Sequence, residues 1–133
     1  MNMEWYRLAI NPQAILDWYT NVPSLSLVYL QAVRLYEKNA QISFMLDITD
    51  VPDKTLSAWK PEWCNTVSLQ LDFLDVTSIQ ITRWSTTNRA DIQIEQMPNN
   101  ALAIHAVSAS TSIQLVAQKF KIASVKCYRR DDL

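Results

Sequence analysis

The sequence predicts a mainly β fold, an antiparallel β-sandwich or curved sheet with a short N-terminal helix, and three observations carry the prediction. From residue 25 onward apolar and polar residues alternate, as in strands with one face in the core and one in water. The alternating stretches recur about every ten residues. No helical stretch separates them, although a parallel α/β fold would need one. The 133 residues have the usual size of one domain, so we expect residues 1–133 to form a single domain.

The N-terminal helix is predicted from its start and stop signals. Asn11 and Pro12 form a start signal, with asparagine as the N-cap and proline at the first helical position. Apolar residues follow, up to Tyr19, at spacings that place them on one helical face. Pro23 then ends the pattern, because the residue before a proline avoids the α region.

About eight strands are expected after the helix. Residues 25–36 and 41–48 form a hairpin whose turn lies at residues 37–40. Residues 50–62 interrupt the alternation with prolines and charges, and we expect the longest irregular loop there. Alternation then resumes, and further strands are predicted around residues 67–73, 79–81, 92–94, 102–106, 113–115, 120–122 and 125–127.

The chain contains no glycine, which restricts both its turns and its function. Tight turns need a positive φ, and asparagine tolerates it best after glycine. We therefore assign the turns to the asparagines in polar breaks, which are Asn39, Asn88, Asn99 and Asn100. The missing glycines also exclude a phosphate-cradling loop, a dinucleotide fingerprint and a nucleophile elbow.

Charge, targeting signals and cysteines narrow the class of protein. The formal net charge is −1, so direct binding of nucleic acid through a strongly basic surface is not expected. The first residues do not form a signal-peptide pattern, and no apolar run reaches the roughly 18 residues that span a bilayer. Cys64 and Cys127 match no redox or zinc motif. We therefore expect a cytoplasmic protein that does not insert into a membrane and whose two thiols are reduced.

Candidates for catalysis are few. His105 is the single histidine, and its register places it opposite Ile104, on the polar face of a strand. A metal site needs several ligands, and general-base catalysis needs a nucleophile and an orienting carboxylate. The aspartates at 47, 50, 72 and 75 fit polar-face and turn positions. We therefore expect no enzyme, no metal and no cofactor, and the rival hypothesis is a hydrolase centred on His105 and nearby carboxylates.

The tryptophans and the C-terminal bases allow more than one interpretation. Trp59 and Trp63 either form an interaction surface or cover the open end of the fold. Trp5 and Trp18 are expected to pin the N-terminal helix to the sheet. Five bases and no acid lie between residues 119 and 130, and we expect a solvated strand face whose lysines protect an edge.

A series of landmarks in fixed order extends over nearly the whole chain. They are Trp5, Asn11-Pro12, Pro23-Ser24-Leu25, Val33-Arg34-Leu35, residues 42–48, Val51-Pro52-Asp53, Trp59, Asn65-Thr66-Val67, residues 69–73, Ile81-Thr82-Arg83-Trp84 and residues 125–128. The series resembles the Immunity protein 50 family, whose members accompany toxins of bacterial polymorphic toxin systems. The resemblance implies a cytoplasmic inhibitor that binds a cognate toxin and neutralises it, and it carries over no catalytic residue.

With this resemblance, the irregular loop and the nearby acids become the predicted toxin contact. Residues 41–75 contain six acids and two lysines, which would suit a basic partner such as a nuclease toxin. Edge strands of the sheet would permit a homodimer. The alternative is a small-ligand or carbohydrate-binding β-module without catalytic activity, which tryptophans on one exposed strip would favour. The predicted toxin-binding residues are Asp50, Asp53, Trp59, Glu62, Trp63, Asp72 and Asp75.

Overall fold

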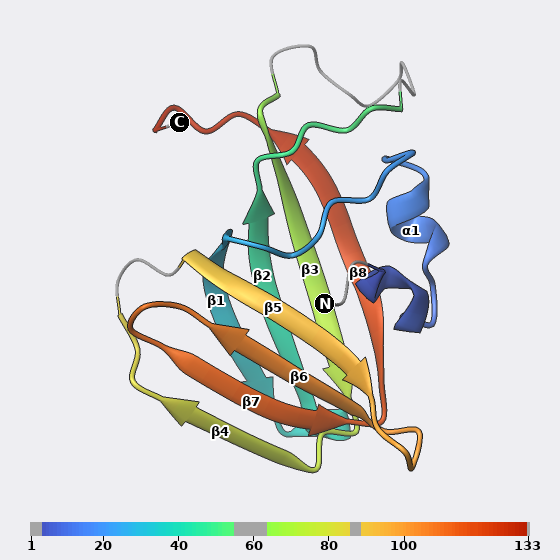
Figure 1. The fold of residues 1–133 in the computed structure, drawn as a ribbon, viewed down its shortest axis with the longest axis vertical. Coiled ribbons are helices and arrows are strands. Elements are labelled where there is room, and N and C mark those ends of the chain that lie inside the picture. Colours follow the sequence, from blue (N-terminus) through green and yellow to red (C-terminus); the bar gives the residue numbers. More distant parts are fainter. Residues whose placement is uncertain (1–3, 55–63, 86–88, 133) are drawn as a thin grey trace.

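The fold is mainly β in the computed structural model, which describes residues 4–54, 64–85 and 89–132 (Figure 1). Within these residues eight antiparallel strands form one sheet, in the order β4-β7-β6-β5-β1-β2-β3-β8. The predicted fold class is thereby confirmed. The strands are β1 (Val28–Tyr36), β2 (Gln41–Ile48), β3 (Thr66–Leu74), β4 (Ser78–Thr82), β5 (Arg89–Gln96), β6 (Leu102–Val107), β7 (Ser112–Ala117) and β8 (Lys119–Tyr128).

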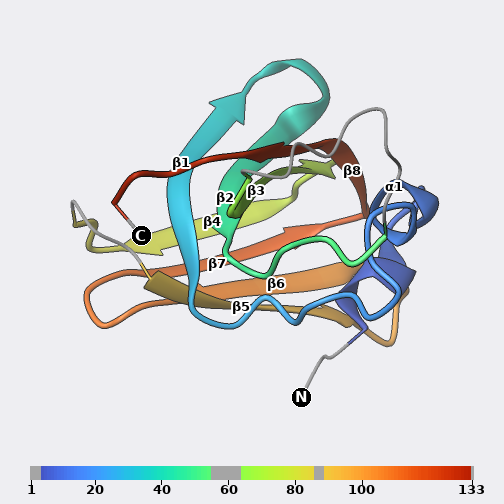
Figure 2. The ribbon, with the colours of Figure 1, turned by 90° about the horizontal axis from the view of Figure 1, so that it is seen from above.

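Strand β1 belongs to both halves of the sheet. Its first residues, Val28 and Tyr29, pair with Ala90 and Arg89 of β5, and from Tyr29 onward β1 pairs with β2. The sheet bends at this junction, so that β5, β6, β7 and β4 lie in front of β1, β2, β3 and β8 (Figures 1 and 2). We call the first set the front layer and the second set the back layer.

The core fills the space between the two layers. Phe44, Phe73 and Phe120 of the back layer are 0% exposed, and Phe73 lies with its ring centroid 5.0 Å from Phe44 and 5.6 Å from Phe120. The front layer contributes Ile94 and Ile104 to the same apolar cluster. Burying each such side chain stabilises the fold by roughly 1.5–3 kcal/mol, so the alternating pattern is the main source of stability.

The N-terminal segment packs beside β8 and contains the predicted short helix, which ends at Leu16 and not at Tyr19. It contains a 3-10 turn, η1 (Trp5–Leu8), and a single helical turn, α1 (Gln13–Leu16). Trp5 is fully buried, its ring centroid lies 6.5 Å from that of Phe120, and its indole N–H donates to the carbonyl of Pro23 at 3.0 Å. Trp5 therefore pins the N-terminal segment to the core.

The predicted N-cap role of Asn11 is wrong, because the cap residue of α1 is Pro12 and no side chain caps the helix. The Asn11 amide instead donates to the backbone carbonyl of Ile122 at 2.8 Å, and its carbonyl oxygen accepts from the Ile122 N–H at 2.8 Å. Ile122 belongs to β8, an edge strand whose outer backbone groups need partners. Asn11 supplies them, and this tertiary demand outweighs the local capping preference.

The glycine-free turns use asparagine only in part. Asn39 and Asn100 have positive φ angles of 63° and 68°, as predicted. Asn99 is not among the positive-φ residues, and its side chain accepts a hydrogen bond from the N–H of Ala101. Asn88 lies outside the described residues. The remaining left-handed positions are occupied by residues that the sequence did not single out: Leu27, Ala40, Asp75 and Arg83.

The two cysteines, expected as separate reduced thiols, form a disulfide in this structure, so that expectation is wrong. The pairing of β3 with β8 places Val67 opposite Cys127, which brings the end of β8 close to the residues that precede β3. The Cα atoms of Cys64 and Cys127 are 5.8 Å apart, a separation at which a disulfide forms without backbone movement. The two cysteines are 63 positions apart in the sequence, so a local motif could not predict that they lie side by side.

Candidate functional site

Polar and charged residues cover the outer face of the back layer, which faces away from the core. The period-two alternation places them there, and the strand register sorts them into rows. One row runs through Tyr29, Asp47, Ser68 and Lys126, and another through Arg34, Ser43, Asp72 and Lys121. Side chains from strands far apart in sequence therefore meet on one surface.

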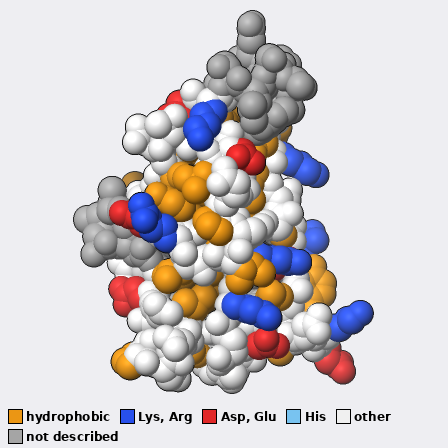
Figure 3. All heavy atoms as spheres, turned by 90° about the vertical axis from the view of Figure 1, so that its right-hand side faces the viewer, with side chains coloured by type: hydrophobic (Ala, Val, Ile, Leu, Met, Phe, Trp, Pro, Cys, Tyr) orange, Lys and Arg blue, Asp and Glu red, His pale blue; other side chains and the backbone are white. Residues whose placement is uncertain are grey.

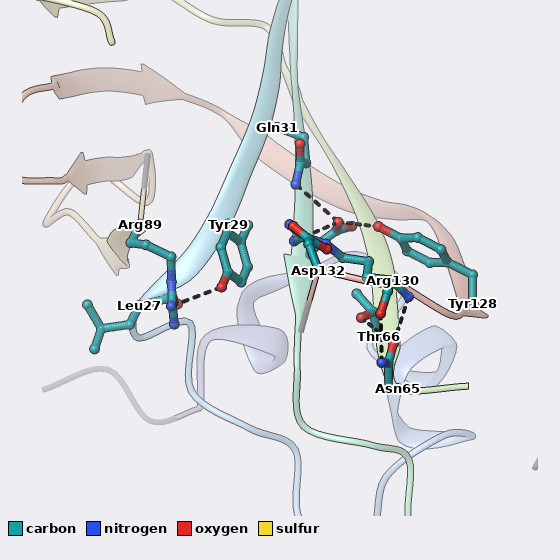
Figure 4. A network of polar contacts seen from close by, with 10 residues as sticks. Leu27, Tyr29, Gln31, Asn65, Thr66, Arg89, Tyr128, Arg130 and Asp132 are labelled. Atoms are coloured by element: carbon teal, nitrogen blue, oxygen red, sulfur yellow. Dashed lines mark hydrogen bonds and ion pairs between the residues drawn. The ribbon is translucent and has the colours of Figure 1, made fainter. Parts of the chain in front are cut away.

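Asp47 is the centre of a hydrogen-bonded network on this face, and its partners Gln31, Tyr128 and Arg130 are labelled in Figure 4. Its carboxylate is only 4% exposed although it points away from the core. One carboxylate oxygen accepts from the Gln31 amide at 3.1 Å, from the Tyr128 hydroxyl and from the Arg130 guanidinium at 3.5 Å. A buried charge is costly unless it is paired and hydrogen-bonded, and these three donors meet that need.

Tyr128 acts as a hydrogen-bond donor in this network. Burial, together with the hydrogen bond to Asp47, raises the pKa of its phenol to about 12. The hydroxyl therefore keeps its proton across the physiological range and donates it to the carboxylate. Ionisation of Tyr128 would place two negative oxygens in direct contact.

Tyr29 lies between two arginines beside this network (Figure 4). The guanidinium carbons of Arg89 and Arg130 are each 4.2 Å from the centre of the Tyr29 ring, a geometry that allows cation–π attraction. Arg89 also donates to the Tyr29 hydroxyl at 3.1 Å and to the backbone carbonyl of Leu27 at 2.9 Å. Tyr29 thus orients both guanidinium groups on the outer face.

The segment after β8 is tied to the back layer by Asn65 and Asp132. The Asn65 side chain donates to the Arg130 carbonyl at 2.9 Å and accepts from the Arg130 N–H at 2.8 Å. The Arg130 guanidinium binds Asp132 through two parallel contacts of 3.0 and 2.6 Å. This hydrogen bonding lowers the pKa of the Asp132 carboxyl and raises that of Arg130.

A hollow of about 430 Å³ lies next to the network on the same face. Asp47, Tyr128 and Arg130 line one part of it, and Ala32, Arg34, Met45 and Ser68 line the rest, together with Gln31. Arg34 is exposed and has no hydrogen bond or ion pair within the described part of the chain. The hollow therefore offers one unpaired guanidinium and one that already holds a carboxylate.

A second hollow, of about 330 Å³, lies on the outer face of the front layer. The strand register aligns Gln80, Gln114, His105 and Gln93 in one row across it. His105 lies opposite the buried Ile104, as predicted, and its Nε2 is 3.4 Å from the Ser112 hydroxyl. Among the residues that the structure describes, no three His, Cys, Asp or Glu side chains are grouped to hold a metal ion.

The structure does not bring together the four predicted toxin-binding residues that it describes, Asp50, Asp53, Asp72 and Asp75. Asp50 and Asp53 are exposed beyond β2, where the Asp50 carbonyl accepts from the Tyr19 hydroxyl at 2.6 Å and the Asp53 carboxylate from the Thr20 N–H at 2.6 Å. Asp75 is exposed beyond the far end of β3, roughly 26 Å away at the usual strand rise. Trp59, Glu62 and Trp63 lie outside the described residues.

Asp72 lies on β3 and is buried, with 5% of its surface exposed. Its carboxylate accepts from the Ser43 hydroxyl at 2.7 Å and from the Gln70 amide at 2.9 Å. These neighbours, rather than solvent, surround the carboxylate on the outer face of the back layer. Asp72 therefore contributes to the polar packing of the strands around it.

The other tryptophans also bear on the sequence-based hypotheses. Trp5 and Trp18 are 0% and 9% exposed, as expected for side chains that pin the N-terminal segment. Trp84 follows β4 and is 50% exposed. Among the described tryptophans, Trp5 and Trp18 are buried and Trp84 is exposed, so these three do not form an exposed carbohydrate-binding strip.

The model of the family described as Immunity protein 50 matches residues 11–128, which is most of the chain. No curated protein and no solved structure matches. In the described residues, no helix is long and apolar enough to cross a membrane. From the extent of the family match, the chain belongs to the Immunity protein 50 family.

Proposed function

We propose that this chain is the immunity protein of a bacterial polymorphic toxin system, which binds a cognate toxin and neutralises it. The observation that carries the proposal is the family match over residues 11–128. The architecture supports it, because a rigid sheet with polar outer faces presents preorganised side chains to a partner at little entropic cost.

Neutralisation is proposed to occur by binding alone. His105 contacts the Ser112 hydroxyl at 3.4 Å, and no hydrogen bond in the described residues joins it to Glu95, the carboxylate that lines the same hollow. A general base needs an orienting carboxylate. Asp47 and Asp72 are each held by neighbouring donors. These surroundings favour a structural role for both carboxylates.

Two of the residues predicted from the sequence to contact the toxin, Asp50 and Asp53, lie together beyond the end of β2. Asp50 and Asp53 are exposed there, next to the 55–63 segment that contains Trp59 and Trp63. Exposed acids would attract a basic region of a toxin, such as the nucleic-acid-binding surface of a nuclease. Pairing of the edge strand β4 between two copies is the proposed route to a homodimer, because the outer backbone of β8 already bonds to Asn11 and Ile10.

We further propose that the protein acts in the cytoplasm of the cell that makes the toxin. Cytoplasmic glutathione keeps thiols reduced, and a Cys64–Cys127 disulfide would be at odds with that compartment. The proposal therefore requires the two cysteines to be neighbouring thiols in the producing cell.

The test is co-expression with the toxin encoded next to this chain's gene. We expect the toxin alone to stop growth and this chain to restore growth, while an immunity protein of an unrelated toxin should not. A neighbouring product that is harmless alone, or equally lethal when this chain is present, would overturn the proposal.

A further inference from the structure

The outer face of the back layer is basic, although the stretch of residues 41–75, which includes β2 and β3, is acid-rich. Four cations at outward positions have no hydrogen bond or ion pair within the described residues: Arg34, Lys119, Lys121 and Lys126. The two aspartates on the strands of this face, Asp47 and Asp72, are 4% and 5% exposed, and the more exposed Asp132 is paired with Arg130. What the face presents to solvent is therefore positive.

This excess of positive charge is local, because the whole chain has a formal net charge of −1. Figure 3 views the molecule from the side and shows Lys and Arg side chains projecting at the right-hand edge, where the back layer lies. A local field of this kind attracts an oppositely charged surface and orients its approach.

Asp132 shows how a carboxylate binds on this face. Its two oxygens meet the Nε and Nη2 atoms of Arg130 at 3.0 and 2.6 Å, the parallel geometry that favours arginine in recognising carboxylates. The Tyr29 ring supports the Arg130 guanidinium from one side, and Asn65 holds its backbone. Arg34 lines the same hollow but binds no carboxylate in the described structure.

We infer that the outer face of the back layer is a docking surface for an acidic segment of the toxin, one of whose carboxylates enters the 430 Å³ hollow beside Arg34. This inference rests on the proposed function and names the surface and the chemistry of its partner. Arginine, tyrosine and methionine, the residue types enriched at interface centres, line the hollow as Arg34, Tyr128 and Met45.

An acidic protein fits this surface better than a nucleic acid does. Binding of single strands relies on aromatic rings whose faces are free to stack on bases. The Tyr29 ring lies between Arg89 and Arg130 and is occupied by them.

The experiment is calorimetric titration of the purified chain with the neighbouring toxin domain, comparing the wild type with Arg34→Glu and Lys126→Glu. We expect each substitution to weaken binding roughly tenfold or more, because a repulsive charge replaces an attractive one. The matched control is Arg83→Glu, which makes the same charge change at an exposed, unpaired arginine outside this face. Arg34→Gln, which removes the charge without reversing it, should have a smaller effect.

The outcomes separate this inference from the proposed function. Wild-type affinity in Arg34→Glu and Lys126→Glu, with loss of binding in Asp50→Lys and Asp53→Lys, would overturn the inference and leave the proposed function intact. No binding by the wild type would overturn both. A single-stranded oligonucleotide that binds the wild type but not Arg34→Glu, while toxin binding is unchanged, would assign the face to nucleic acid instead.

Discussion

The Tyr128 hydroxyl donates a hydrogen bond to the Asp47 carboxylate and joins the end of β8 to the end of β2 across 81 positions of sequence. β3 lies between these two strands, so the contact reaches over a third strand of the back layer. Together with Gln31 and Arg130, it buries an acid on a face that would otherwise be open to water. The network both stabilises the C-terminal segment and gives the outer face its basic character.

Replacing Tyr128 with phenylalanine should therefore destabilise the fold. The substitution removes one of three donors to a buried carboxylate, and such a loss costs about 1–3 kcal/mol. Chemical denaturation of the variant and the wild type measures the change in the free energy of unfolding. The matched control is Tyr36→Phe, at an exposed tyrosine without a partner in the described structure, and equal losses in the two variants would contradict the role of the network.

Alkaline pH should weaken the fold through the same tyrosine. Its pKa is raised from 10.0 to about 12, so the unfolded chain loses this proton before the folded chain does. The contribution of Tyr128 to stability is thus complete below pH 10 and is lost as the pH rises toward 12. The free energies of unfolding of the wild type and of Tyr128→Phe, plotted against pH, should converge between pH 10 and pH 12. Parallel curves would contradict the role of the Tyr128 hydroxyl as a donor to Asp47.

Asn11→Ala should loosen the N-terminal segment at the edge of β8. The substitution removes both side-chain hydrogen bonds to the Ile122 backbone and leaves that backbone without these partners. We expect a loss of about 1–3 kcal/mol and faster hydrogen exchange at Ile122. Asn21→Ala, at an exposed asparagine with no partner in the described residues, should change neither quantity.

The cysteine pair gives a test of compartment. If the protein acts in the cytoplasm, rapid alkylation of producing cells followed by mass spectrometry should find Cys64 and Cys127 modified as free thiols. Oxidation of the purified protein should then add about 4 kcal/mol of stability, as expected for a closed loop of this length. A disulfide found in freshly quenched cells would contradict the cytoplasmic assignment, and the Cys64→Ser variant should still protect.

The strands were predictable because their pattern is local. Ile42, Phe44, Leu46 and Ile48 recur at every second position of β2, and this spacing alone assigns them to the core. The role of Asn11 was not predictable in the same way, since its capping preference is local but its partner, Ile122, lies 111 positions away. Local sequence patterns therefore predicted the strands, whereas the bonding partner of Asn11 was set by a contact between segments far apart in the sequence.

The character of the outer faces was the hardest part to predict. Alternation places Asp47 and Asp72 outside, and a count of acids then predicts an acidic surface. Tyr128, Arg130 and Ser43 cover these carboxylates, and two of the three come from the opposite end of the sequence. One feature of the sequence does indicate a basic outer face. It is the run of bases between residues 119 and 130, most of which belongs to β8, the neighbour of β3 in the sheet.

The stoichiometry of neutralisation tests the central claim most directly. A binding protein must occupy each toxin molecule, whereas an enzyme would inactivate many. Titrating a fixed amount of the neighbouring toxin with this chain should abolish toxin activity near one chain per toxin, with a stable complex on size-exclusion chromatography. Full inactivation by far less than one equivalent, or no complex at any ratio, would contradict the account.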